Sequence, residues 1–264
     1  MFPRLTKLAC VAVAFTLSYA AQAAPIWMAG DDGSMLYTVE STTGASSLVG
    51  NFNQSAVYTL SFDGTGNLYG MSNGFSNGTL VRINQATGNA TTVGGATGIA
   101  DLMALAFAAD GTLYAGSWNT NSLYTIDKIT GAATTVGALG FGGIMDLDFD
   151  SQGNLYALSD SLYRVDLTTG HGSLVTTLAN SCLMGMAIDQ QDRFLATDYC
   201  SPNTPLYQIN TSNGTLTSLG DTGIASAMGG AIQAVNVPEP ASLSLFGAAF
   251  AGLLVTRRRA RKHA

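Results

Sequence analysis

Between its two ends, this chain of 264 residues has few basic residues, and their scarcity limits what the protein can bind. Seven of the eleven Lys and Arg residues lie in the first seven or the last eight positions. Residues 24–236 therefore keep four cations against 16 acidic residues, a formal charge of −12. Because phosphate binding needs clustered Lys and Arg, we expect no nucleic-acid partner.

The same stretch is almost without His and Glu, which removes the usual routes to acid–base catalysis. His171 is the only His of residues 24–236, and Glu40 is the only Glu. Neither has an orienting partner in a neighbouring motif, so a Ser-His-Asp triad and a paired-Glu site are both disfavoured. The sequence therefore predicts no catalytic site.

Long hydrophobic runs are confined to the two ends. Arg4 and Lys7 precede an apolar run over residues 8–17, and Ala21-Gln22-Ala23 offers small residues at both positions that signal peptidase reads. About ten apolar residues fall short of the roughly 20 that a spanning helix needs. We interpret residues 1–23 as a signal peptide, which is removed during export.

The C-terminal end has three parts. Val237-Pro238-Glu239-Pro240 comes first, an apolar segment follows over residues 241–256, and basic residues close the chain. This basic cluster consists of Arg257, Arg258, Arg259, Arg261 and Lys262. Such a cluster keeps a tail on the cytoplasmic side, so residues 237–264 are expected to hold the precursor in the inner membrane through a transmembrane helix.

In order and spacing, these parts resemble the PEP-CTERM sorting signal of Gram-negative bacteria. The resemblance implies processing by an exosortase, a membrane-embedded cysteine transpeptidase-like enzyme. It also implies association with exopolysaccharide or biofilm matrix at the cell surface or outside the cell. An ordinary C-terminal membrane anchor is the alternative. Under either interpretation, residues 24–236 lie outside the cytoplasm.

An internal repeat of about 40 residues organises the exported part. Leu68-Tyr69, Leu113-Tyr114 and Leu155-Tyr156 recur at spacings of 45 and 42, and Phe194-Leu195 follows after 39. Each copy continues into a second pair of strands, in which a turn glycine joins an apolar strand to a Thr/Ser/Val strand. Five copies of that second strand pair indicate an all-β, five-bladed β-propeller of four-stranded antiparallel blades over residues 24–236.

The first copy lacks its innermost strand, and the end of the repeat region supplies one. Residues 26–28 align with the second strand of the other units, whereas residues 229–235 form a spare apolar strand. We expect this C-terminal strand to complete the first blade and to close the ring, which leaves no open sheet edge.

Cysteine is also scarce. Cys10 leaves with the signal peptide, so only Cys182 and Cys200 remain, in an oxidising compartment. If Ile188 faces Phe194 across the turn, the same register places Cys182 opposite Cys200, at a Cα separation that a disulfide accepts. A disulfide is therefore predicted.

The repeats are similar to those of NHL and SMP-30-like propellers, in which an Asp-x-x-Gly-Asn-Leu-Tyr segment is common. Residues 150–156 and 63–69 both fit this pattern, which forms a turn between two strands. The similarity implies one alternative function, an SMP-30-like metal-dependent hydrolase or lactonase. That family uses Glu, Asp and Asn along its channel, and no Glu lies on an inner strand here.

Asp146 and Asp148 alternate along one innermost strand, so both are expected to point toward the central channel. Ca²⁺ prefers several carboxylate and carbonyl oxygens, which makes this pair a candidate metal site. The intervening Leu147 and Phe149 are typical of a strand and not of a calcium loop. A purely structural role is the competing interpretation.

A second candidate lies where the second strand of each blade ends, since these loops share one rim of a propeller. Polar side chains with one aromatic neighbour are predicted to gather there: Asp31, Asp32, Asn73, Trp118, Asn119, Asp160 and Asp198. They suit a shallow site for a cation or for sugar hydroxyls. Asx turns at strand ends would explain the same residues.

Together, these observations predict an exported surface or matrix-associated propeller, which acts as a binding or structural module linked to exopolysaccharide. No cofactor other than a Ca²⁺ ion is expected. A matrix protein without any ligand is the remaining interpretation.

Overall fold

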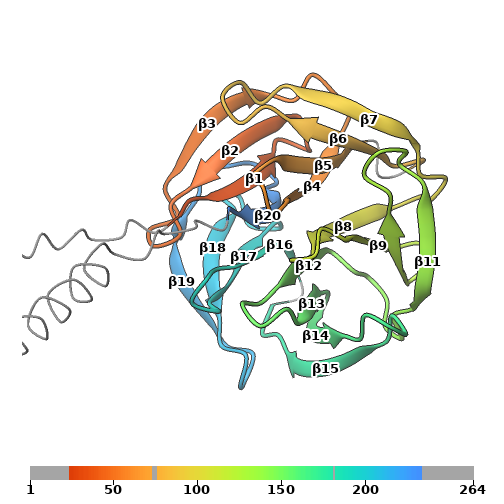
Figure 1. Cartoon of the computed structure of the whole chain (residues 1–264). Coiled ribbons are helices and arrows are strands. Elements are labelled where there is room, and N and C mark those ends of the chain that lie inside the picture. Colours follow the sequence, from red (N-terminus) through yellow and green to blue (C-terminus); the bar gives the residue numbers. More distant parts are fainter. Residues whose placement is uncertain (1–23, 73–75, 181, 234–264) are drawn as a thin grey trace, which may run out of the picture.

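The computed structural model describes residues 24–72, 76–180 and 182–233, which form a five-bladed β-propeller (Figure 1). The predicted signal peptide, the sorting tail and Asn73 lie outside the described residues. Each blade is a four-stranded antiparallel sheet, and the described strands number twenty. The predicted fold class is therefore confirmed.

The strands of each blade run from the axis outward in a constant order. Blade 1 contains β20 (Met228–Ile232), β1 (Ile26–Gly30), β2 (Met35–Val39) and β3 (Ser46–Asn51). Blade 2 contains β4 (Val57–Phe62), β5 (Leu68–Ser72), β6 (Thr79–Ile83) and β7 (Ala90–Ala96). Blade 3 contains β8 (Leu102–Phe107), β9 (Leu113–Ser117), β10 (Ser122–Ile126) and β11 (Ala133–Ala138). Blade 4 contains β12 (Asp146–Phe149), β13 (Leu155–Leu158), β14 (Ser161–Val165) and β15 (Gly172–Thr177). Blade 5 contains β16 (Leu183–Ile188), β17 (Phe194–Asp198), β18 (Pro205–Ile209) and β19 (Leu216–Asp221).

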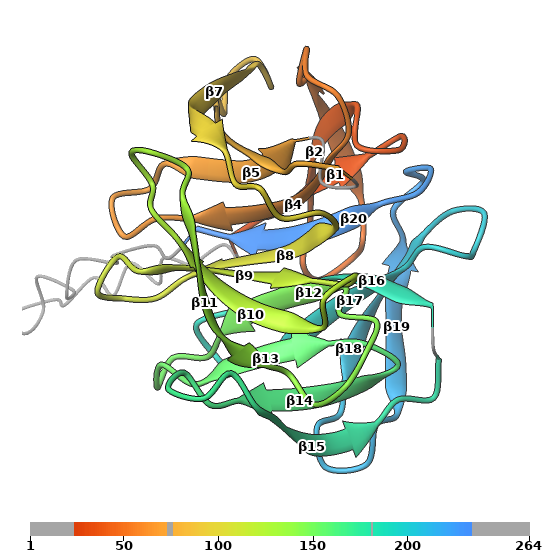
Figure 2. The ribbon, with the colours of Figure 1, turned by 90° about the vertical axis from the view of Figure 1, so that its right-hand side faces the viewer.

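The C-terminal strand closes the ring as the repeat predicts. β20 pairs antiparallel with β1, with Ile26 opposite Ile232, and it also packs against β16 and β4 of the neighbouring blades. The five inner strands surround the axis (Figure 1), and Figure 2 shows from the side that β20, in blue, lies beside β4 of blade 2. β20 ends at Ile232, and residues 234 and 235 of the predicted closing strand lie outside the described residues.

Five hydrophobic clusters hold the ring together, one at each interface between adjacent blades. Between blades 1 and 2, for example, Leu36 packs with Val57, Leu60 and Leu68. Equivalent clusters fill the other four interfaces. Burial of apolar faces between blades is the main stabilising contribution, because no blade can cover both of its own faces.

Turn glycines join the blades at their outer edge. Gly88, with φ of +79°, lies at the turn before β7, and a Cβ there would come within 2.7 Å of the Gly50 backbone in blade 1. Gly170 approaches Gly137 of blade 3 in the same way, at 2.8 Å. Only glycine combines the positive φ with so close an approach of two backbones.

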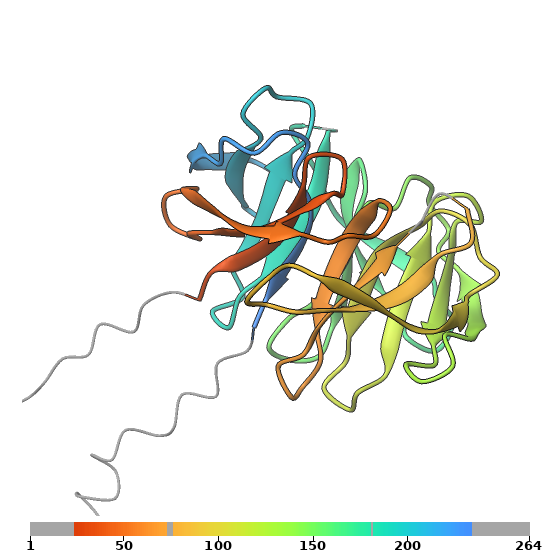
Figure 3. The ribbon, with the colours of Figure 1, turned by 90° about the horizontal axis from the view of Figure 1, so that it is seen from above.

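The two ends of each inner strand define two faces of the propeller. The tail face carries the turns that follow the inner strands, 63–67, 108–112, 150–154 and 189–193, together with Ala24 and Gln233. The chain therefore enters and leaves the propeller on one side (Figure 3). The opposite loop face carries the predicted rim residues that the structure describes.

The predicted disulfide is present on the loop face, although the register is less simple than expected. Cys182 and Cys200 are bonded, with their Cα atoms 5.8 Å apart. Ile188 faces Phe194 as predicted, but a β-bulge between Leu183 and Gly185 shifts the pairing, so Leu183 faces Asp198. The disulfide lies beyond this bulge and ties the linker from blade 4 to a loop of blade 5.

Candidate functional site

The predicted rim residues that the structure describes lie on the loop face, but most of them do not contact one another. Trp118, which is 43% exposed, and Asn119 follow β9, whereas Asp160 follows β13 in the next blade. Within the described part of the chain, no side-chain hydrogen bond joins these three residues to the other rim residues. Tyr199 of blade 5 approaches Asp32 of blade 1, at 3.4 Å from its hydroxyl to Oδ1. The shared rim site stays a prediction.

Asp198 serves its own loop. Its Oδ1 accepts the N–H of Cys200 at 3.0 Å, and its Oδ2 accepts hydrogen bonds from Asn180 Nδ2 and Ser201 Oγ, both at 2.8 Å. Although Asp198 lies beside Cys182 and Cys200, the two thiols are consumed by the disulfide. Asx-turn chemistry therefore accounts for this rim residue.

Asp31 is occupied in a similar way at the first blade. Tyr37 donates its hydroxyl to Asp31 Oδ2 at 2.5 Å. Burial, together with this hydrogen bond and the nearby charge of Asp31, raises the pKa of Tyr37 to about 12. The pair holds the turn between β1 and β2, in which Asp31 and Asp32 both have positive φ.

Asp146 points toward the axis, as predicted, and is completely buried there. Its Oδ2 accepts the N–H of Met186 at 2.8 Å and of Gly230 at 3.0 Å, and its Oδ1 accepts the N–H of Leu147 at 2.9 Å. Burial raises the pKa of the carboxyl well above its ordinary value. Asp146 thus satisfies backbone donors at the inner edges of β16 and β20, which otherwise lack acceptors.

Asp148 is only partly covered and lies closer to the tail face. Its Oδ2 accepts the N–H of Ile188 at 2.6 Å and its Oδ1 accepts the N–H of Phe149 at 2.8 Å. Burial raises its pKa to about 7. Backbone donors thus already contact both carboxylates of the predicted metal site, and a Ca²⁺ ion there stays a prediction.

The Asp-x-x-Gly-Asn turns of blades 2 and 4 contain a hydrogen-bonded relay that the motif alone did not reveal. In blade 2, Asp63 Oδ2 accepts from Asn67 Nδ2 at 2.9 Å, and Asn67 Oδ1 accepts from Arg82 on β6. In blade 4, Asp150 Oδ2 accepts from Asn154 Nδ2 at 2.7 Å, and Asn154 Oδ1 accepts from Arg164 on β14. Each aspartate orients an asparagine, which in turn orients an arginine.

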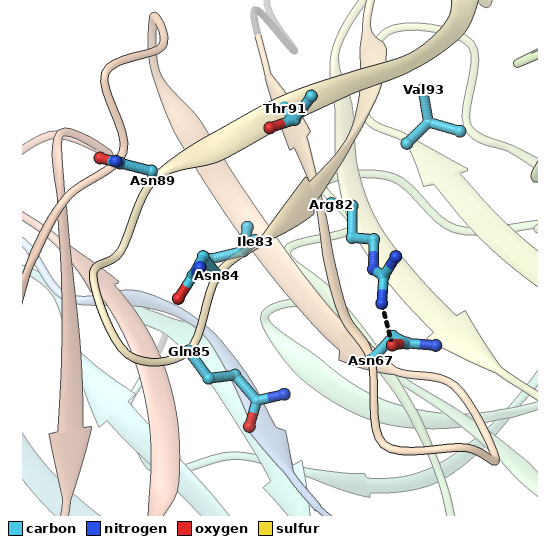
Figure 4. A pocket seen from close by; sticks show the side chains of 8 residues that line it. All are labelled: Asn67, Arg82, Ile83, Asn84, Gln85, Asn89, Thr91 and Val93. Atoms are coloured by element: carbon cyan, nitrogen blue, oxygen red, sulfur yellow. Dashed lines mark hydrogen bonds between the residues drawn. The ribbon is translucent and has the colours of Figure 1, made fainter.

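Arg82 lies in a polar cavity of about 470 Å³, which we call the blade-2 groove (Figure 4). Amide, guanidinium and hydroxyl groups dominate its lining, which consists of Asn67, Arg82, Ile83, Asn84, Gln85, Asn89, Thr91 and Val93. A hydrogen bond joins Arg82 and Asn67 in this view, while the amides of Asn84, Gln85 and Asn89 lie to the left of this pair. The side-chain amides can both donate and accept hydrogen bonds, and the guanidinium donates them in its own plane.

A matching cavity of about 510 Å³, the blade-4 groove, surrounds Arg164. The strand registers align the two grooves position by position. Arg82 pairs with Tyr69 and Thr91, and Arg164 pairs with Tyr156 and Ser173. Each arginine therefore has an asparagine of the turn on its inner side and a hydroxyl residue on its outer side.

Blades 1, 3 and 5 differ at this position. The residues that align with Arg82 are Thr38, Thr125 and Gln208. In blade 5 the cation has moved into the turn, where Arg193 Nε lies 2.6 Å from Asp189 Oδ2 in the only ion pair among the described residues. Arg82 and Arg164 are exposed, and within the described part of the chain their hydrogen bonds go to the neutral amides of Asn67 and Asn154.

Sequence reasoning missed both grooves because it treated the Asp-x-x-Gly-Asn motif as a turn and did not connect it with the arginines. A usable signal was present. Two of the four cations of residues 24–236 lie at the same repeat position, and each occurs in a repeat that also contains the Gly-Asn pair.

The repeat fold and the sorting tail together define the class, an exported five-bladed β-propeller that an exosortase processes. The chain belongs to the family described as "Repeat of unknown function (DUF6923)", whose model matches residues 27–189. The PEP-CTERM protein-sorting motif matches residues 236–259, which confirms the resemblance of the tail. No curated protein matches this sequence.

Solved structures show the same fold at low sequence identity. A chain of the nidogen/laminin complex has a TM-score of 0.57 and 12% identity, with 80% of this chain and 82% of that chain covered. A symmetrical protein from work on de novo evolutionary emergence under folding constraints has a TM-score of 0.55 and 17% identity, with coverage of 80% and 100%. A structural-genomics protein of unknown function from Bacteroides thetaiotaomicron has a TM-score of 0.52 and 15% identity, with coverage of 78% and 60%. These similarities define the fold alone.

In residues 24–72, 76–180 and 182–233, no helix has the length and apolar character needed to cross a membrane.

Proposed function

We propose that the mature protein is a non-enzymatic binding module of the cell surface or extracellular matrix, which holds acidic exopolysaccharide in the blade-2 and blade-4 grooves. The observation that carries this proposal is the state of Arg82 and Arg164. Both occupy one repeat position in a domain with a formal charge of −12, and neither forms an ion pair with any residue that the structure describes. A neutral asparagine, held by an aspartate, orients each of them.

The chemistry of the grooves favours a carboxylated sugar. A guanidinium presents donors in a fixed plane that matches a carboxylate, and a neutral amide leaves its positive charge available. In the blade-2 groove, Asn84, Gln85 and Asn89 add donors and acceptors for sugar hydroxyls. The sorting motif supports the same conclusion, because its resemblance implies association with exopolysaccharide outside the cell.

Two equivalent grooves favour a polymer over a single sugar. They belong to alternate blades and are both close to the tail face, so one chain of repeating uronate units has two places to bind. Simultaneous binding at two grooves raises the apparent affinity through effective concentration without any new contact.

Binding of the mature protein to alginate, a polyuronate, compared with dextran, a neutral polymer, tests the proposal. We expect binding to alginate alone. A charged hydrogen bond contributes about 1.5–3 kcal/mol, so Arg82→Gln and Arg164→Gln should each weaken binding by about tenfold or more. The double variant should lose the advantage of long polymers over short oligomers.

Lys128→Gln is the matched control, since it removes one positive charge from the tail face without altering a groove. We expect it to bind alginate as the wild type does. An equal loss of binding in this variant would reduce the effect to net charge and would contradict the proposed site. Equal binding of dextran and alginate, or alginate binding unaffected by the arginine substitutions, would contradict recognition of acidic sugars.

A further inference from the structure

The centre of the tail face contains a cavity of about 340 Å³, which we call the central funnel. Each inner strand contributes one large apolar side chain at its tail-face end: Phe62, Phe107, Phe149, Ile188 and Ile232. Phe62 and Phe149 are partly exposed and line the funnel, while their rings also contact Trp27 and Tyr114 of the neighbouring blades, at centroid distances of 6.1 and 5.9 Å. Phe107 is 9% exposed.

The funnel is closed at its inner end. Asp146 fills the axis and bonds to β16 and β20, and Gly230 lies so close to β16 that a Cβ there would be 2.5 Å from the Met186 carbonyl oxygen. Beyond this point, Tyr58, Met103 and Met228 pack together toward the loop face. A ligand can therefore enter from the tail face alone, and the volume is within the range of small-molecule sites.

Four aspartates supply the charged groups of the funnel, and Ser61, Ser151 and Gln190 add neutral polar groups. Asp148 lies in its wall next to Phe149, and Asp63, Asp150 and Asp189 stand at the turns around its opening. The lining residues include no Lys, Arg or His, and the neighbouring Arg193 is paired with Asp189. An apolar ring next to negative charge is thus the chemical character of the cavity.

We propose that the central funnel binds a small organic cation, an amine or quaternary ammonium attached to an apolar body. The apolar body fits between the Phe and Ile side chains. The cationic group gains from the carboxylate of Asp148. An anion would be repelled by the carboxylates of Asp63, Asp148 and Asp150, whereas a bare metal ion would leave the apolar ring unused. This site is independent of the two sugar-binding grooves.

Calorimetric titration of the mature protein with 4-phenylbutylamine tests the proposal, with 4-phenylbutanol and tetramethylammonium as matched probes. We expect the amine to bind at least tenfold more tightly than either probe, because only the amine combines the apolar body with the charge. Asp148→Asn should reduce the affinity for the amine by about tenfold while that for the alcohol stays unchanged. Equal binding of amine and alcohol, or no binding of the amine, would overturn the proposal.

A variant that blocks the funnel opening provides a second test if Asp148→Asn fails to fold. Gly64 lines the funnel opening, has an ordinary φ, and a Cβ there would have no atom within 4 Å. Gly64→Trp should therefore fold normally and abolish amine binding. Gly95→Trp on β7, where a Cβ would be 3.7 Å from its nearest neighbour, adds the same side chain away from the funnel and should bind as the wild type does. Unchanged binding in Gly64→Trp would place the amine elsewhere and refute the site.

Discussion

Reduction of the Cys182–Cys200 disulfide should lower the stability of the propeller by an amount that the loop length sets. The bond joins residues 18 apart in sequence, and it constrains the linker before β16 against the loop after β17. A closed loop of this length stabilises the folded state by about 3 kcal/mol, mainly by restricting the unfolded chain. For a domain of this size, 1 kcal/mol corresponds to about 2–4 °C, so the midpoint should fall by about 6–12 °C.

Thermal unfolding followed by circular dichroism, with and without reductant, measures this shift. The folded spectrum should not change, because hydrogen bonds from Asn180, Ser201 and the Cys200 backbone to Asp198 hold the loop without the disulfide. The variant with Cys182→Ser and Cys200→Ser is the control, since it should unfold at the midpoint of the reduced protein and be indifferent to reductant. Equal midpoints for the oxidised and reduced wild type would refute the reasoning.

Substitutions at the axis give the remaining predictions. Gly230→Ala should destabilise the protein by about 1–3 kcal/mol in urea unfolding, because the new Cβ collides with the Met186 carbonyl of β16. An unchanged urea midpoint would show that β16 and β20 can move apart to accommodate the Cβ without a loss of stability. Asp146→Leu leaves three buried N–H groups without an acceptor and should lower the free energy of unfolding by at least about 3 kcal/mol. The loss should be smaller in Asp146→Asn, which keeps one acceptor oxygen. The reverse order of the two losses would contradict the role assigned to this carboxylate. Burial raises the pKa of Asp148 from 3.8 to about 7, so the folded state binds this proton more tightly than the unfolded state. Wild-type stability relative to Asp148→Asn should therefore fall as the pH rises from 3.8 to about 7 and stay level above it, and a difference independent of pH would count against the assignment. Thermal unfolding with Ca²⁺ and with EDTA tests the predicted metal site at Asp146 and Asp148. A higher midpoint with Ca²⁺ would confirm it, and equal midpoints would show that the backbone donors alone use these carboxylates.

The repeat pattern was sufficient to predict the blades. Leu-Tyr pairs at regular spacing and turn glycines between alternating strands are local features, and each is enforced by the chain next to it. The same pattern identified β20 as the missing strand of blade 1, since one unit lacked a strand and the other end of the repeat region had one to spare.

Local features were insufficient where two blades meet. The sequence shows Gly50 at a strand end and Gly88 at a turn, but their contact across the blade boundary depends on the curvature of the ring. The disulfide was predicted with the right partners on a register that omits a bulge, because an extra residue in a strand leaves no mark in the alternation of apolar residues.

The two candidate sites likewise depend on contacts that local sequence features do not reveal. Arg82 and Asn67 are 15 residues apart in the chain, and their pairing requires β5 and β6 to bring the turn and the strand together. The central funnel combines one residue from every inner strand. Phe62, Phe107, Phe149 and Ile188 recur at the repeat spacings of 45, 42 and 39, but only closure of the ring brings them together with Ile232 around one cavity.

By itself, then, the sequence determined the sorting tail, the number of blades and the way in which the ring closes, because these depend on composition and on local periodicity, and it predicts the signal peptide in the same way. The tertiary structure alone decided which polar groups remain available to a ligand. Hydrogen bonds already use the carboxylates of Asp146 and Asp198, whereas Arg82 and Arg164 have no carboxylate partner among the described residues. The funnel lies on the face where the chain leaves the propeller. The physical reason is that hydrogen bonding and burial are settled between blades, by groups that lie far apart along the chain.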